Sequence, residues 1–274
     1  MFAQVRGSDA HRLLLDAAHR LAPLDAALAR DTLLEALGAA IFAGRLSVGA
    51  WLREVAEAAR ADLGGRFGYV WANQPAAASY TPSPTYQFNS AGSVNTITRS
   101  GVGQYTVRLP SIGSAAGHVQ VTAYGDVLAR CKTVNWYPSG TAQLVNVRCF
   151  TFGGSPRDTQ FTLTYTRGTG LLRATPAAYA WANQPTTASY TPATAYQYNS
   201  AGYANRITRQ GVGVYRVWTP GMALGYGDVQ VTAYGLDSRY CKVDYWTPST
   251  GIQVRCFSTV GAPADTYFDV SFVR

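Results

Sequence analysis

Four cysteines are the residues best suited to covalent chemistry, and they come as two pairs. Cys131 and Cys149 enclose 17 residues, and Cys241 and Cys256 enclose 14. Each pair flanks a hairpin pattern whose centre holds Pro-Ser-Gly or Pro-Ser-Thr-Gly. Antiparallel neighbours can bring two Cα atoms within bridging distance. The sequence therefore predicts two disulfides, each stabilising its domain by about 3 kcal/mol.

The two pairs belong to an internal repeat. Residues 69–138 align with 179–248 at a constant offset of 110, and Val-Gln-Val-Thr-Ala-Tyr-Gly recurs intact at 119–125 and 229–235. Short stretches of alternating apolar and polar residues, separated by Gly and Pro, are typical of β-strands. In the first repeat we expect eight strands, near 68–73, 85–89, 94–99, 104–109, 118–124, 130–136, 144–150 and 160–166.

The polar residues that both repeats keep do not compose a catalytic set. After residue 64 the chain has no Glu and a single His, His118, whose counterpart is Asp228. A Ser-His-Asp set, a carboxylate pair or a Cys-His pair cannot be built twice from such a list. The cysteines lack metal-ligand spacing. We expect no enzyme, no metal and no cofactor, and we assign Asp158 and Asp265 to Asx-type turns before the last strand.

Aromatic and arginine side chains remain as candidates for ligand binding. Trp71 with Tyr80, and Trp181 with Tyr190, could form sugar-stacking faces, although core packing is the more common use of such residues. Arg99 and Arg209 are kept in both repeats. The expected partner is a glycan or another protein.

The motifs of the repeat resemble a known type of module. Ile-Thr-Arg is followed by Gly-Val-Gly-x-Tyr-x-Val, Val-Gln-Val-Thr-Ala, Val-Arg-Cys-Phe and a closing Pro-x-Asp-x-x-Phe. This order resembles an uncharacterised β-sandwich module of secreted and surface proteins of actinobacteria, similar in outline to the complement/tumour-necrosis-factor jelly roll. The resemblance covers both repeats and implies no defined activity.

The first 64 residues differ from the rest in composition. They hold 7 Arg and 8 Asp and Glu, and their apolar residues recur with helical spacing, which predicts two to three helices. Residues 13–25, 29–37 and 43–46 resemble the helical repeat region of large LuxR-family regulators. Neither a phosphate-binding loop nor a helix-turn-helix is recognisable. The resemblance implies a spacer, and an alternative function as a fragment or fusion of such a regulator with a β-sandwich sensor.

Charge and cysteines bear on partners and location. The net charge of +8 comes from scattered Lys and Arg, so we do not expect nucleic-acid binding. No apolar run is long enough to span a membrane, and the start has no signal-peptide pattern. Disulfides nevertheless indicate an oxidising exterior. The β part is expected to be extracellular or on the cell surface, or cytoplasmic if the helical segment is genuine.

Together these observations predict a mainly β chain with two tandem antiparallel β-sandwich domains, jelly-roll or immunoglobulin-like, and a short N-terminal α-helical segment. The expected function is a structural or ligand-binding one. The expected parts are the helical segment 1–64, repeat 1 at 68–167, a linker at 168–178 and repeat 2 at 179–274.

Overall fold

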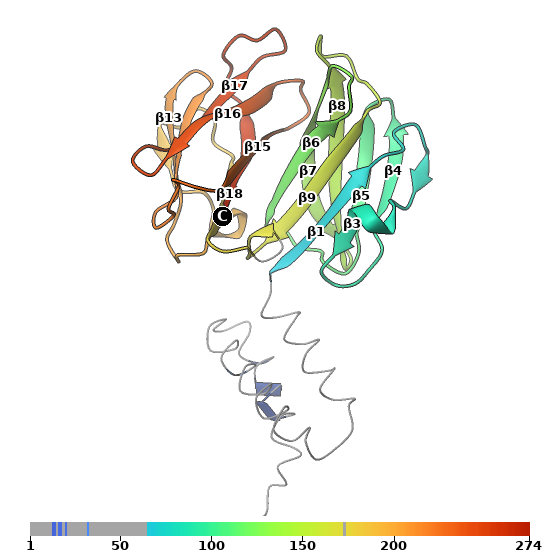
Figure 1. Ribbon diagram of the computed structural model, residues 1–274, viewed down its shortest axis with the longest axis horizontal. Helices are drawn as coiled ribbons and strands as arrows, with labels where there is room; N and C mark the ends of the chain where they lie inside the picture. Colours follow the sequence, from blue (N-terminus) through green and yellow to red (C-terminus); the bar gives the residue numbers. More distant parts are fainter. Residues whose placement is uncertain (1–12, 15, 18–19, 21–31, 33–64, 172–173) are drawn as a thin grey trace, which may run out of the picture. The chain divides into compact units, whose positions relative to one another are not determined.

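The computed structural model describes residues 13, 14, 16, 17, 20, 32, 65–171 and 174–274. The six described residues ahead of Gly65 have helical backbone, and the rest of the predicted segment 1–64 lies outside the described residues. No helix in the described part of the chain is long and apolar enough to cross a bilayer. Residues Arg66–Arg274 form one compact unit (Figure 1).

Repeat 1 is built of strands that alternate buried and exposed residues. A short 3₁₀ turn, η1 (Pro84–Tyr86), precedes its third strand. The strands are β1 (Arg66–Ala72), β2 (Ser79–Tyr80), β3 (Gln87–Asn89), β4 (Thr96–Gly101), β5 (Gln104–Leu109), β6 (His118–Tyr124), β7 (Ala129–Ser139), β8 (Ala142–Thr151) and β9 (Gln160–Arg167).

Repeat 2 reproduces this order element by element. Its 3₁₀ turn is η3 (Thr194–Tyr196). Its strands are β10 (Ala177–Ala182), β11 (Ser189–Tyr190), β12 (Gln197–Asn199), β13 (Arg206–Gly211), β14 (Val214–Trp218), β15 (Asp228–Tyr234), β16 (Tyr240–Thr247), β17 (Gly251–Phe257) and β18 (Tyr267–Val273).

The strands of the two repeats form three sheets. Repeat 1 contributes a four-stranded sheet in the order β3-β1-β9-β6, and repeat 2 contributes a five-stranded sheet in the order β11-β13-β14-β17-β16. The third sheet has nine strands: β12-β10-β18-β15 of repeat 2 continues into β7-β8-β5-β4-β2 of repeat 1. The continuation is one parallel pair, Tyr234 opposite Thr133, whereas the other strand pairs of the described chain are antiparallel.

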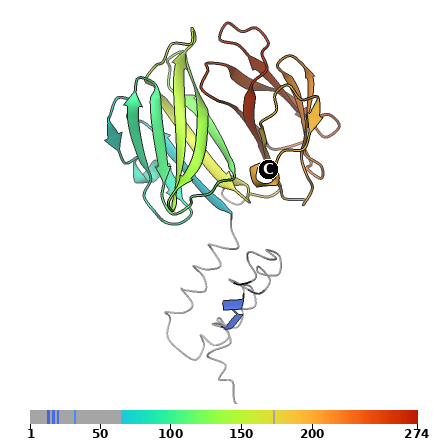
Figure 2. The same ribbon diagram turned by 180° about the vertical axis from the view of Figure 1, so that it is seen from behind.

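Each repeat has a buried core of its own. In repeat 1, Val70 of β1 and Phe161 of β9 share one cluster with Val107 of β5 and Val147 of β8, so side chains from both groups of strands meet. Repeat 2 has the equivalent cluster, with Phe268 and Val254 at its centre. Seen from behind, the strands of the two repeats lie side by side (Figure 2).

The predicted mainly β fold is confirmed, and the eight strands expected in repeat 1 all have an observed counterpart. The structure adds β2, a two-residue strand that pairs Ser79 with Thr98 and Tyr80 with Ile97. So short a strand has no periodicity to read. The expected linker 168–178 overlaps β10, which begins at Ala177.

Candidate functional site

Both predicted disulfides are present. Cys131 of β7 lies opposite Cys149 of β8, and Cys241 of β16 lies opposite Cys256 of β17. In each pair the Cα atoms are 4.0 Å apart. Each bridge therefore joins neighbouring strands of one hairpin, as the turn residues between the cysteines predicted.

An ion pair ties two distant parts of repeat 1 together. Nε and Nη2 of Arg99, on β4, donate to the two carboxylate oxygens of Asp158 at 3.0 and 2.7 Å. Oδ1 of Asp158 also accepts from the hydroxyl of Tyr105 at 3.0 Å and from the N–H of Gly103 at 2.8 Å. Gly103 has a φ of +64°, and a Cβ there would overlap the carbonyl oxygen of Cys149. The carboxylate thus fixes the β4–β5 hairpin beside β9.

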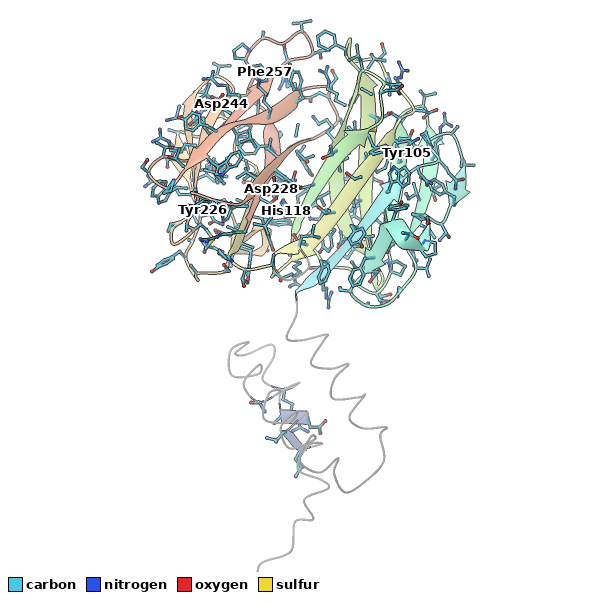
Figure 3. The ribbon with its side chains drawn as sticks, viewed as in Figure 1. Tyr105, His118, Tyr226, Asp228, Asp244 and Phe257 are labelled. Atoms are coloured by element: carbon cyan, nitrogen blue, oxygen red, sulfur yellow. A yellow bond between two sulfur atoms is a disulfide. The ribbon has the colours of Figure 1, made fainter. Side chains whose placement is uncertain are left out.

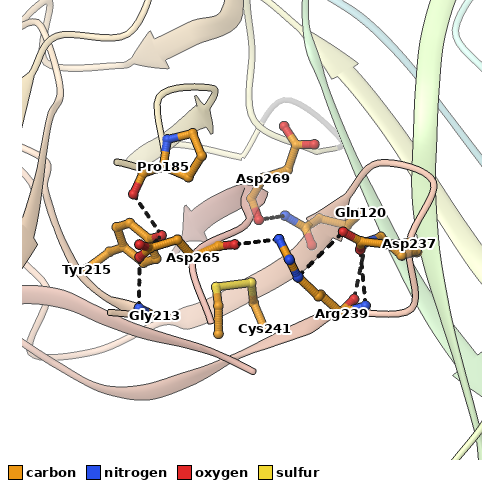
Figure 4. Close-up of a disulfide and its surroundings, with 11 residues drawn as sticks. Gln120, Pro185, Gly213, Tyr215, Asp237, Arg239, Cys241, Asp265 and Asp269 are labelled. Atoms are coloured by element: carbon orange, nitrogen blue, oxygen red, sulfur yellow. Dashed lines mark hydrogen bonds and ion pairs between the residues drawn. A yellow bond between two sulfur atoms is a disulfide. The ribbon is translucent and has the colours of Figure 1, made fainter. Parts of the chain in front are cut away.

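Repeat 2 contains the same arrangement. Arg209 binds both oxygens of Asp265, which also accepts from Tyr215 at 2.8 Å and from the N–H of Gly213 at 2.9 Å. Figure 4 shows Asp265 between Tyr215 and Gly213, close to Cys241. Since both repeats conserve the full set of contacts, the cluster is part of the architecture of each repeat.

These contacts lower the pKa of both carboxyl groups. For Asp158 the hydrogen bond from Arg99 is the main cause, and the pKa falls to about 2. Burial alone would raise the pKa of Asp265, but the hydrogen bonds from Arg209, Gly213 and Tyr215 outweigh it. Both carboxylates therefore remain ionised across neutral pH and hold their arginines in place.

The structure corrects the expectation of Asx-type turns at these aspartates. The carboxylate of Asp158 bonds to a distant hairpin and not to the backbone of its own turn. Asp158 and Asp265 are the ion-pair partners of Arg99 and Arg209. Both candidate ligand-binding arginines are therefore already engaged within the chain. A pairing across 59 residues leaves no local signal in a sequence.

The other candidate residues of repeat 1 do not form the expected pair. Tyr80 lies on β2, packs against the core and accepts a hydrogen bond from the N–H of Gln74 at 3.2 Å. Trp71 lies on β1, in a different sheet. Its ring contacts Tyr86 at 4.9 Å and Tyr124 at 5.2 Å between centroids. We call Trp71, Tyr86 and Tyr124 the aromatic face of repeat 1.

The corresponding residues of repeat 2, Trp181, Tyr196 and Tyr234, form an equivalent aromatic face, with Tyr190 separate on β11. This face is covered by Trp136, on β7 of repeat 1. The Trp136 ring lies 5.6 Å from Trp181, 5.9 Å from Tyr196 and 5.5 Å from Tyr234. Aromatic rings at such distances and tilted angles attract one another beyond their burial. Repeat 1 therefore binds the aromatic face of repeat 2.

Polar contacts surround this aromatic contact. Nζ of Lys132, which is buried, donates to Asp237 at 2.8 Å and to the carbonyl of Arg239 at 3.2 Å. The amide of Gln120 donates to the carbonyl of Asp269 at 3.2 Å and accepts from the hydroxyl of Thr232 at 2.5 Å. Figure 4 shows Gln120 meeting the backbone of Asp269. These pairs fix the orientation of the two repeats.

Two buried titratable groups lie in this contact region. The ring of His118, labelled in Figure 3, stacks on Tyr179 of repeat 2 at 5.0 Å, and its burial lowers its pKa to about 3. Asp269 is fully buried, neither carboxylate oxygen has a hydrogen-bond partner, and burial raises its pKa well above the usual value. Burial therefore favours the neutral form of both side chains.

A cavity of about 310 Å³ lies between the repeats and is lined by both. Equivalent residues of the two repeats line it: Val121 and Val231, and the half-cystines Cys131 and Cys241. Of its charged lining residues, Lys132 and Arg239 are paired with Asp237, and Arg130 donates to the carbonyl of Phe152. Within the described residues no three His, Cys, Asp or Glu side chains gather as a metal site would need. The cavity therefore offers no obvious reactive group.

The sequence reasoning found Trp71 and Trp181 but missed the partners of their rings. Tyr86 and Tyr124 recur in both repeats, as Tyr196 and Tyr234. That recurrence marks them as a shared feature, yet their meeting depends on the pairing of β1, β6 and β9, which the sequence does not specify. Comparison with family models, curated proteins and solved structures found no match.

Proposed function

We propose that the chain is a non-enzymatic protein of two tandem β-sandwiches, with a structural or ligand-binding role outside the cell. Each repeat has four of its strands in one sheet and five in another. The sandwich assignment is supported by the single core that the strands of these two sheets share in each repeat. The non-enzymatic assignment is supported by the polar residues of the repeats, which are engaged in ion pairs that fix the fold. The disulfides favour an oxidising compartment.

The observation that carries the proposal is the difference between the two aromatic faces. In repeat 2 the face is covered by Trp136, whereas in repeat 1 Tyr86 and Tyr124 are each 52% exposed. Exposed aromatic clusters mark binding surfaces more often than isolated apolar residues do. We infer that the aromatic face of repeat 1 is the binding site. A protein ligand is favoured, because the equivalent face of repeat 2 binds protein side chains.

A glycan array probed with the wild-type chain and with Tyr86→Ala/Tyr124→Ala tests the choice of ligand. We expect no glycan signal. A signal that the double variant loses would make the ligand a carbohydrate and keep the site, whereas a signal that persists in the variant would place the site elsewhere.

The location is tested separately by mass spectrometry of the protein from its native host. We expect intact Cys131–Cys149 and Cys241–Cys256 bridges. Free thiols at all four positions would contradict an extracellular role, and would favour the alternative of a regulator fusion with a β-sandwich sensor.

A further inference from the structure

The aromatic contact joins different surfaces of the two repeats. Repeat 2 presents its aromatic face, Trp181, Tyr196 and Tyr234. Repeat 1 presents a surface on β6 and β7 that we call its docking face, formed by Gln120, Lys132 and Trp136. Because the repeats are equivalent, each also has the surface that the other one uses. A contact of this head-to-tail kind leaves one unused surface at each end.

Both unused surfaces are exposed. The docking face of repeat 2 consists of Gln230, Lys242 and Trp246, all exposed, and Trp246 is 36% exposed where Trp136 is only 9%. Trp246 holds the same place in its sheet as Trp136: it lies opposite Ile252, as Trp136 lies opposite Val145, after an equivalent β-bulge. The aromatic face of repeat 1 is the other unused surface.

The sheet edges beside these surfaces are only partly free. Between the repeats, the edge strands β15 and β7 join where Tyr234 lies opposite Thr133, and the N–H of Gly235 donates to the carbonyl of Thr133 at 2.9 Å. In the described chain β6 and β16 each end a sheet. Both strands nevertheless meet the other repeat: the hydroxyl of Thr232 bonds the N–H and the carbonyl of Val121 on β6, and Arg130 lies over the ring of Tyr240 on β16. Gly125, which follows β6, has a φ of +110°, almost the +109° of Gly235. The backbone at the end of β6 thus has the same local geometry as the backbone at the end of β15.

Charges at the two unused surfaces are complementary. Lys132 pairs with Asp237 in the loop after β15. Its counterpart Lys242 is exposed, and the equivalent loop after β6 carries an exposed acid, Asp126, one position earlier than Asp237 in the alignment. Such a pair favours this orientation of two chains over others.

Two positions of the first contact are not reproduced. Asp228 replaces His118, so the stacking of His118 on Tyr179 has no equivalent, and Thr162 replaces Asp269. The second change removes a buried carboxyl group without hydrogen-bond partners. The unused surfaces therefore retain the aromatic and charged elements of the contact and lose one ring stack.

We propose that the partner of the aromatic face is a second copy of this chain. Trp246 of one chain packs on Trp71, Tyr86 and Tyr124 of the next, and Lys242 of the first chain faces Asp126 of the second. The proposal rests on the binding role assigned above to the aromatic face of repeat 1. Since the contact is head-to-tail, it extends from chain to chain and builds a linear array or a closed ring of repeats.

Sedimentation velocity of the full chain over a range of concentrations tests the proposal. We expect the wild type to form species larger than a dimer as its concentration rises. Trp246→Ala and Tyr86→Ala/Tyr124→Ala each remove one side of the contact and should weaken association about 30-fold, as expected for an aromatic hot spot. Tyr203→Ala, at an exposed tyrosine of repeat 2 outside both faces, should associate as the wild type does.

Mixing the two one-sided variants is the decisive measurement. Each keeps the surface that the other lacks, so the mixture should form a one-to-one dimer and nothing larger. Near-UV circular dichroism shows that each variant is folded. If either fails, the charge reversals Lys242→Asp and Asp126→Lys serve instead, because each is weak alone and the mixture restores an opposite-charge pair.

Three outcomes would overturn the proposal: a wild type that is monomeric at the highest soluble concentration, a Trp246→Ala variant that associates as well as the wild type, or a mixture that stays monomeric. A monomeric wild type that binds glycans through the aromatic face would leave the proposed binding role intact and refute only the self-association.

Discussion

Trp136 of repeat 1 packs edge-on against Trp181 of repeat 2, with ring centroids 5.6 Å apart and planes at 71°. Trp136 also belongs to the core of repeat 1, and its Nε1 donates to the carbonyl of Ala116 at 3.2 Å. One side chain thus links the interior of one repeat to the surface of the other. The unfolding of the two repeats should be coupled through it.

Replacing this tryptophan should be much more costly than replacing its counterpart. Trp136→Ala removes a buried ring and should lower the free energy of unfolding by about 3–5 kcal/mol. Trp246→Ala, at the equivalent register position but exposed, should lower it by less than about 1 kcal/mol in the monomer. Denaturant unfolding at low protein concentration compares the two. Equal losses would mean that the contact between the repeats adds no stability.

The cluster around Asp158 predicts a loss of stability in acid. The folded pKa of about 2 lies below the usual 3.8, so the stabilisation is complete above pH 3.8 and is lost as the pH falls towards 2. Asp158→Asn should lower the melting temperature by several degrees at pH 7 and leave it nearly unchanged at pH 2. Asp126→Asn is the control, because that carboxylate is exposed. A variant that melts like the wild type at pH 7 would contradict the role of the cluster.

The sequence was sufficient for features that repeat locally or by duplication. Alternating residues such as Val119, Val121 and Ala123 predicted strands, and the spacing of the cysteines predicted bridges between neighbouring strands. The hairpin at Gly101-Val102-Gly103 can likewise be read from the sequence, because glycine tolerates the positive φ that Gly103 adopts.

Features that depend on which strands become neighbours could not be predicted. The sequence suggested Trp71 and Tyr80 as one sugar-stacking face, whereas the sheet order places Trp71 beside Tyr124, 53 positions further along the chain. The contact of Trp136 with Trp181 depends in addition on how the two repeats pack against each other. An alignment of the repeats shows which residues are equivalent, but it does not show that their surroundings differ.

Disulfide reduction should destabilise both repeats. The bridges close loops with sequence separations of 18 and 15 residues, and each contributes about 3 kcal/mol by restricting the unfolded chain. Cys131→Ser/Cys149→Ser and Cys241→Ser/Cys256→Ser should each lower the free energy of unfolding by a similar amount. Calorimetry of both variants measures this. A loss confined to one variant would show that one bridge alone stabilises the unit.

The buried Asp269 predicts a site where a substitution stabilises the protein. Burial raises the pKa of Asp269 in the folded chain, so the folded chain keeps a proton that the unfolded chain releases. The contribution of this group to stability is therefore fully present below the unfolded pKa and is lost as the pH rises through the folded pKa. Asp269→Asn cannot ionise and should therefore melt several degrees above the wild type at pH 8, with little difference at pH 3. Thermal melts at both pH values measure this. A lower melting temperature at pH 8 would mean that the carboxylate has a stabilising partner.

His118 should make the contact between the repeats sensitive to mild acid. Burial lowers its folded pKa to about 3, so the unfolded chain binds a proton between about pH 6.5 and 3 that the folded chain does not bind. The free energy of unfolding should therefore decrease as the pH falls from about 6.5 to about 3, with a limiting slope of about 1.4 kcal/mol per pH unit.

The surroundings of the His118 ring offer no group that would hold its protonated form. Gln120, Thr166 and Tyr179 contact the ring, and none of them carries a charge. His118→Gln should flatten the stability profile between pH 6.5 and 4. A slope that survives in His118→Gln would assign the acid sensitivity to the carboxylates, and the aromatic contact between the repeats would then be independent of pH in this range.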